Sequence, residues 1–144
     1  MDKPPPDRRD QYPHILEIPT RWMDNDVYGH VNNVVYYSYF DTVVNRYLID
    51  RGALDIENSP IIGLVVETQC RFFKSITFPD IVHAGLRVAR LGNRSVRYEI
   101  GLFRNDEGDA AAQGHFIHVY VERFTRRPAA VPSEMRKALE LILA

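Results

Sequence analysis

The sequence predicts an α+β domain in which a five-stranded antiparallel sheet wraps around one long, buried helix. Three observations support this prediction: one strand pattern precedes a long apolar segment, four strand patterns follow it, and the links between those four are short. Short links favour antiparallel neighbours, so we expect the last four strands to form a meander. A helix that is apolar over most of its circumference must be covered, and a single sheet curled around it buries both.

The first strand and the helix have recognisable boundaries. One side of residues 14–23 is formed by Leu16, Ile18, Thr20 and Trp22. Pro19 has no backbone N–H and indicates an edge strand or a bulge. Asn32 and Asn33 are suited to cap the helix, and Gly52 is suited to end it. The β-branched and aromatic residues between them also allow a strand, but about eighteen residues are too many for a typical strand.

Four further strands are expected at residues 61–73, 80–91, 95–104 and 114–123. Shared sides in the last three are formed by Val82, Ala84, Leu86 and Val88, by Val96, Tyr98, Ile100 and Leu102, and by Ile117, Val119 and Val121. The segments S-I-T-F-P-D, L-G-N-R and N-D-E-G-D separate the strands and fit turns. A short helix should close the chain, with Ser133 as its cap.

The 144 residues fit one domain, which we expect to span residues 14–144 behind a flexible, proline-rich arm at residues 1–13. The start lacks the apolar stretch of a signal peptide, and no apolar run reaches the ~18 residues of a membrane span. The single cysteine, Cys70, excludes an intrachain disulfide and suits a reducing compartment. The sequence therefore predicts a cytoplasmic protein without a membrane segment.

Charge and sheet geometry limit the partners. The formal net charge is -1, so no overall basic field exists to hold nucleic acid. An anionic ligand must therefore meet a local cluster of Lys and Arg. One helix cannot cover a five-stranded sheet completely, and the sheet keeps open edges, so we expect a homodimer or homotetramer.

Residues 21–33, R-W-M-D-N-D-V-Y-G-H-V-N-N, place many polar residues before the most apolar segment of the chain. A calcium loop is excluded, because Tyr28 and Val35 stand where oxygen ligands are required. A metal site on His30 is disfavoured, because no second histidine or cysteine lies at ligand spacing. Two interpretations remain: the stretch simply caps the helix, or it forms a catalytic site.

The catalytic interpretation uses the helix N-terminus. This end offers unpaired backbone N–H groups near Val31, Asn32 and Asn33, which can polarise a carbonyl and stabilise an oxyanion. A nearby carboxylate, from Asp24 or Asp26, could attack the carbonyl or deprotonate a water that does so. Together these groups would serve acyl transfer to water.

The same stretch, followed by V-V-Y-Y-S-Y-F-D, resembles the signature of the 4-hydroxybenzoyl-CoA thioesterase family, which has the hotdog fold. The family pattern is roughly D-x-D-x-x-G-H-V-N-N before an aromatic-rich helix, and the match extends from Asp24 to Phe40. The expected strand order agrees with this fold through residue 124. The resemblance therefore covers most of the chain and rests on several residue types in a fixed order.

This resemblance implies the roles of the catalytic candidates. Asp26 would be the catalytic carboxylate, whereas Asp24 would order the loop or a neighbouring Arg21. The backbone N–H of Asn33 would face the thioester carbonyl. His30 would support the loop or contact the substrate.

The resemblance also suggests substrate-binding residues. Tyrosines of the helix would be core residues or would line an acyl tunnel at a subunit interface. Coenzyme A carries phosphates, which need basic partners, and relatives place such residues around the turn that Arg90 and Arg94 flank. Arg71 and Lys74 are further candidates for the phosphates. The complete set of expected binding residues is Tyr28, Val31, Asn32, Tyr36, Arg90, Arg94 and Lys74.

We therefore expect an acyl-CoA thioesterase that needs no metal or organic cofactor. A G-x-S-x-G nucleophile motif is absent, and Cys70 has no histidine at an evident register. A non-catalytic acyl-CoA-binding protein and an acyl dehydratase or hydratase of the same fold remain as alternatives. The acyl group, the choice between coenzyme A and a carrier protein, and the choice between nucleophile and general base for Asp26 stay open.

Overall fold

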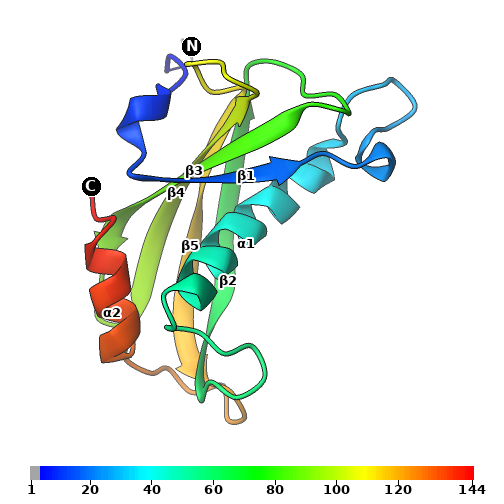
Figure 1. The fold of residues 1–144 in the computed structure, drawn as a ribbon. Coiled ribbons are helices and arrows are strands. Elements are labelled where there is room, and N and C mark those ends of the chain that lie inside the picture. Colours follow the sequence, from blue (N-terminus) through cyan, green and yellow to red (C-terminus); the bar gives the residue numbers. More distant parts are fainter. Residues whose placement is uncertain (1–3) are drawn as a thin grey trace.

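The computed structural model describes residues 4–144 and has the predicted hotdog fold, an antiparallel sheet curved around one long helix (Figure 1). The strands are β1 His14–Pro19, β2 Ile61–Phe72, β3 Ile81–Leu91, β4 Ser95–Arg104 and β5 Ala112–Glu122. The α-helices are α1 Asn33–Asp50 and α2 Ser133–Glu140, and short 3-10 helices occupy η1 Arg9–Gln11 and η2 Trp22–Asp24. No helix among the described residues is long and apolar enough to span a membrane.

The strand order is β1-β3-β4-β5-β2, which corrects the expected four-strand meander. Only β3, β4 and β5 follow one another as neighbours. β2 pairs with β5, because residues 73–80 carry the chain from one edge of the sheet across to the other side before β3 begins (Figure 1). β1 and β2 are therefore the two edge strands.

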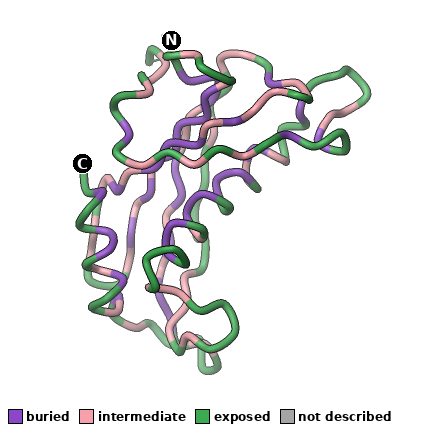
Figure 2. The backbone as a smooth tube through the Cα atoms, in the orientation of Figure 1, coloured by how far each residue is buried: buried purple, intermediate pink, exposed green. Residues whose placement is uncertain are grey.

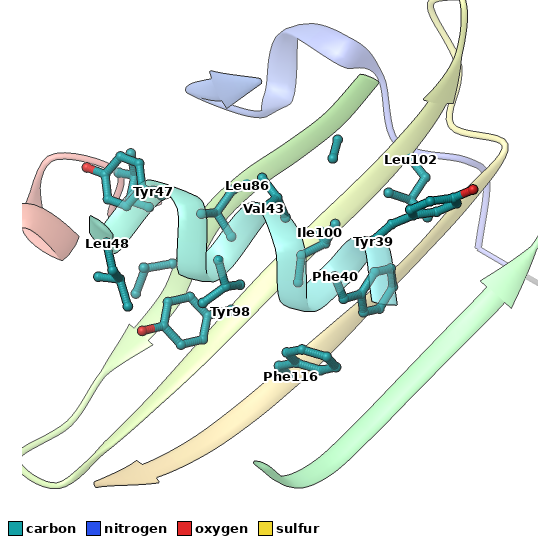
Figure 3. Packing of buried hydrophobic residues seen from close by; sticks show 14 of the residues in the cluster. Tyr39, Phe40, Val43, Tyr47, Leu48, Leu86, Tyr98, Ile100, Leu102 and Phe116 are labelled. Atoms are coloured by element: carbon teal, nitrogen blue, oxygen red, sulfur yellow. The ribbon is translucent and has the colours of Figure 1, made fainter. Parts of the chain in front are cut away.

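Helix α1 begins and ends as its sequence predicts. The side chain of Asn32 accepts a hydrogen bond from Val34 N–H at 3.0 Å, which caps the N-terminus. Gly52 follows the last turn with φ +69°, a conformation that glycine adopts without a steric penalty. The face toward the sheet buries Tyr36, Tyr39, Phe40, Val43, Val44, Tyr47 and Leu48, several of which Figure 3 shows against β3, β4 and β5.

The sheet presents its apolar face to α1. The predicted inner sides of β3 and β4 are confirmed, because every residue from Val82 to Val88 and from Val96 to Leu102 on those sides is buried. In β5 the inner side carries Phe116, His118 and Tyr120 rather than Ile117 and Val119. Tyr98 lies opposite Phe116 across the strand pair, and directly opposed residues share a face. Figure 2 shows that β2, in contrast, is largely exposed.

Two chain segments differ from the prediction. β1 ends at Pro19, and Trp22 lies exposed in η2 instead of extending the strand. Helix α2 is preceded by Pro132 as its N-cap, so Ser133 is its first residue and not its cap.

The N-terminal segment was expected to be a loose arm, but part of it packs on the outer face of the sheet. Tyr12 is buried in a slot above Gly85 and Gly101, where any Cβ would meet its ring at 2.7 Å. Its hydroxyl donates to Asp7 at 2.7 Å, and the guanidinium of Arg87 lies 4.5 Å from its ring centroid. Residues 1–3 of the expected arm lie outside the described residues.

Candidate active site

Asp26 opens a tight turn before α1. Its backbone N–H donates to the carbonyl of His30 at 2.8 Å, and its carbonyl accepts from Gly29 at 3.1 Å. Gly29 has φ +83°, which permits this turn. Oxygen Oδ1 of the half-buried carboxylate accepts the Tyr28 N–H at 2.8 Å. Oδ2 accepts no hydrogen bond within residues 4–144, so one oxygen is held and the other is available.

Asp24, two residues earlier, is instead enclosed by the protein. Its carboxylate accepts hydrogen bonds from the Arg21 guanidinium at 2.9 Å and from the Tyr39 hydroxyl at 3.0 Å. Its backbone carbonyl accepts the Asn32 N–H at 2.9 Å. Burial alone would raise the pKa of Asp24, but the hydrogen bonds from Arg21 and Tyr39 outweigh burial and lower this pKa. Asp24 therefore ties the loop to the helix as a fixed anion.

The amides at the start of α1 are not equally available. Val31 N–H donates to the Ile76 carbonyl at 2.7 Å, and Asn32 N–H is used by Asp24. Val34 N–H is used by the Asn32 side chain. The Asn33 N–H has no hydrogen-bond acceptor in the described part of the chain. Of the three amides considered from sequence, Asn33 is thus the one left free at the positive end of the helix dipole.

Asp26 and Asn33 both line a cavity of about 650 Å³. It is lined by Asp26, Tyr28, His30, Val31, Asn33, Tyr36, Phe72, Phe73, Lys74 and Ser75. Seven of the predicted site residues therefore meet in one place, whereas Asn32 acts as the helix cap outside the lining. Sequence reasoning missed Phe72, Phe73 and Ser75, although the aromatic pair at the end of an expected strand was a usable signal.

The predicted basic residues do not all meet at this cavity. Across the sheet, Phe72 of β2 pairs with Ala112 of β5, Ala112 with Leu102 of β4, and Leu102 with Ala84 of β3. Phe72 and Ala84 therefore lie at the same height in the sheet. Arg90 lies six residues further along β3, roughly 20 Å away by the rise of a strand. Arg94 follows in the β3–β4 turn, so both lie at the opposite end of the sheet within one chain. Arg71 is exposed on β2 and lines a separate hollow of about 310 Å³.

Aromatic side chains form part of the cavity wall. Tyr36 is buried and meets Phe72 edge-on, with ring centroids 4.9 Å apart. Burial raises the pKa of Tyr36, so its hydroxyl stays neutral. Burial raises the pKa of the single thiol, Cys70, to about 12, which leaves it a poor nucleophile at neutral pH. The described residues contain no group of three or more His, Cys, Asp or Glu side chains placed to hold a metal ion.

An unpaired helix amide can accept a developing oxyanion, and a carboxylate with an unbonded oxygen can activate water, so the groups at this cavity have the chemistry that acyl transfer needs. In agreement, the chain belongs to the thioesterase-like superfamily, whose family model matches residues 20–139. This match does not single out the 4-hydroxybenzoyl-CoA thioesterase family that the motif resembles.

Solved structures with the same fold include proteins from two bacteria. The PA5185 protein of Pseudomonas aeruginosa PAO1 is 54% identical, with a TM-score of 0.95 and 98% of each chain covered. The PA2801 protein of Pseudomonas aeruginosa, named as a candidate thioesterase, is 31% identical, with a TM-score of 0.80 over 87% of this chain and 96% of that one. A DHNA-CoA thioesterase from Staphylococcus aureus shares the fold at 22% identity, with a TM-score of 0.77 over 88% and 86% of the two chains.

Proposed function

We propose that the protein hydrolyses acyl-CoA thioesters to a free acid and coenzyme A. The observation that carries this proposal is the meeting of the Asp26 carboxylate and the unpaired Asn33 N–H at one cavity. Membership of the thioesterase-like superfamily supports a hydrolase. The coenzyme A part of the proposal is supported by the name of the DHNA-CoA thioesterase with the same fold.

In this mechanism the thioester carbonyl oxygen rests on the Asn33 amide, which stabilises the negative charge that develops on attack. Asp26 uses its free oxygen in one of two ways. It attacks the carbonyl carbon and expels the coenzyme A thiolate, and water then cleaves the resulting anhydride. Alternatively, it takes a proton from a water that attacks the carbonyl carbon, and the C–S bond breaks to release the thiolate. His30 lines the cavity, and its ring makes no hydrogen bond with the described residues, so a contact with substrate is its proposed role. Tyr28, Val31 and Tyr36 would form the wall around the acyl group.

The working form is proposed to be at least a homodimer. Edge strand β2 exposes Leu64, Val65 and Val66, which are 37%, 46% and 59% exposed. An open apolar edge strand is a template for pairing with another chain. A second copy would cover this edge.

The proposed location is the cytoplasm. Cys70 forms no disulfide, which is consistent with a reducing compartment.

The test is hydrolysis of a panel of acyl-CoA substrates that varies chain length and aromatic substituents. Asp26→Asn should lower kcat by at least about 10²-fold on every substrate, because it removes the base or nucleophile. Asp50→Asn, an exposed carboxylate at the far end of α1, is the matched control and should keep full activity. Calorimetry should show that Asp26→Asn still binds coenzyme A.

Two results would count against this proposal. Unchanged hydrolysis by Asp26→Asn would remove the assigned role of that carboxylate. Binding of acyl-CoA by the wild type without turnover of any panel member would favour the non-catalytic acyl-CoA-binding alternative.

A further inference from the structure

Two cations converge on one carboxylate beside the candidate active site. Arg104 Nε donates to Glu107 Oε2 at 2.7 Å, and Lys74 Nζ donates to Glu107 Oε1. All three side chains are about one-third exposed, so the cluster is partly buried but remains accessible to solvent. The hydrogen bonds from Lys74 and then Arg104 lower the pKa of Glu107, which keeps the carboxylate ionised.

This cluster is joined directly to the cavity that holds Asp26 and Asn33. Lys74 is itself a lining residue. Arg104 Nη1 donates to the carbonyl of Ser75, which also lines the cavity, at 3.0 Å. The cations therefore stand at the rim of the site, on the same end of the sheet as the start of α1.

The cluster carries more positive than negative charge. Lys74 and Arg104 together share the single carboxylate of Glu107, which leaves one positive charge uncompensated. A further cation, Arg9, donates to the backbone carbonyl of Glu107 at 2.9 Å. The next carboxylate of the loop, Asp109, is taken by Arg8 at 3.7 Å, and Asp106 is exposed and forms no ion pair within residues 4–144.

The guanidinium of arginine and the ammonium of lysine both bind carboxylates and phosphates, so two cations that share one carboxylate are also suited to hold a phosphate. We propose that Lys74 and Arg104 form a subsite for a phosphate of the substrate's carrier arm, and that Glu107 holds both cations ready and gives way to that phosphate. This inference rests on the proposed thioesterase function. It assigns phosphate recognition to this rim in place of Arg90 and Arg94 of the same chain.

The experiment compares two thioesters of the same acid. Acyl-CoA carries the phosphates, and acyl-pantetheine presents the same thioester arm without them. Lys74→Gln and Arg104→Gln should each reduce the ratio of kcat/KM for acyl-CoA to that for acyl-pantetheine by about tenfold, equivalent to the loss of ~1.4 kcal/mol of binding. General damage to the fold lowers both rates together and leaves this ratio unchanged.

Glu107→Gln provides the opposite test. It removes the competing charge, so it should raise the ratio and lower KM for acyl-CoA by a factor of roughly two to five, and this gain should fade at high salt as the charges are screened. Arg46→Gln breaks an exposed Arg–Asp pair on α1 and is the matched control, for which the ratio should stay at the wild-type value.

If the ratio of kcat/KM for acyl-CoA to that for acyl-pantetheine is unchanged in both Lys74→Gln and Arg104→Gln, the proposed subsite is wrong. If Glu107→Gln reduces this ratio, Glu107 does not compete with the phosphate for the two cations. If no thioester is hydrolysed at all, the proposed function fails separately. In that case calorimetric titration with coenzyme A and with pantetheine still decides whether the two cations bind phosphate, since a subsite requires tighter binding of coenzyme A by the wild type than by the variants.

Discussion

Asp24 and Asp26 differ in their surroundings although one residue separates them. Asp24 is 1% exposed and satisfied by Arg21 and Tyr39, whereas Asp26 keeps an unbonded oxygen at the cavity. Spacing alone could not assign these roles, because either carboxylate could cap or catalyse. The resemblance to a known motif selected Asp26 as the candidate, and the geometry adds the reason that Asp24 is already fully engaged.

The buried histidine His118 gives a prediction about stability and pH. Its ring stacks on Phe116 with centroids 5.5 Å apart, and its Nε2 is buried without a partner in the described chain. Burial lowers its pKa to about 4. Between about pH 6.5 and pH 4 the unfolded chain therefore binds a proton that the folded chain does not, and the free energy of unfolding falls as pH falls, by up to about 1.4 kcal/mol per pH unit.

We expect His118→Phe to show a shallower loss of stability between pH 7 and pH 5 than the wild type. Part of the slope should remain, because burial and the neighbouring Arg51 also lower the pKa of His14. Urea unfolding at the two pH values measures the difference. Equal slopes in the two proteins would show that His118 takes up its proton in the folded state.

At the level of elements, helix α1 was the most predictable part of the chain. A capping asparagine, a long apolar run and a terminal glycine are local signals, and Asn32 and Gly52 act as expected. The pairing of β2 with β5 was not predictable in this way, because it depends on where residues 73–80 carry the chain. The predicted inner side of β5 was wrong, because Ile117 and Val119 are more apolar than His118 and Tyr120, and only the register with β4 shows that the latter face the helix.

The geometry at the start of α1 allows the Asn33 N–H to be removed without disturbing the rest of the helix. Asn33 is the first residue of the helix, and Asn32 before it has φ -62° and ψ 139°. A proline is tolerated at a first helical position, and the residue before it must have extended geometry of this kind. Asn33→Pro therefore removes the unpaired N–H and leaves the rest of the helix hydrogen bonding intact.

At the level of the whole molecule, the two ends of the sheet carry different groups. The cavity, Lys74 and Arg104 gather at the end where α1 begins, and Arg90 and Arg94 lie at the other end. Strand order and direction fix this separation, so residue spacing in the sequence could not reveal it. The sequence did indicate most cavity residues, because they lie in one continuous motif.

The open edge of β2 makes the proposed dimer testable. Val66→Lys places a charge where a second copy would pair, so it should shift the protein toward monomer. Ile15→Lys makes the same change on β1, the opposite edge strand, and should leave the assembly intact. Sedimentation velocity measures both. A monomeric wild type, or a Val66→Lys variant that associates as the wild type does, would contradict assembly through β2.

The role of the Asn33 amide is tested by comparing kcat for thioester hydrolysis in Asn33→Pro and Asn33→Ala. Alanine keeps the backbone N–H and proline deletes it, while both allow the helix to form. If the Asn33 amide stabilises the oxyanion beside Asp26, the proline variant should be slower than the alanine variant by about 10²–10³-fold. Equal kcat values in two folded variants would show that this helix end does not polarise the thioester.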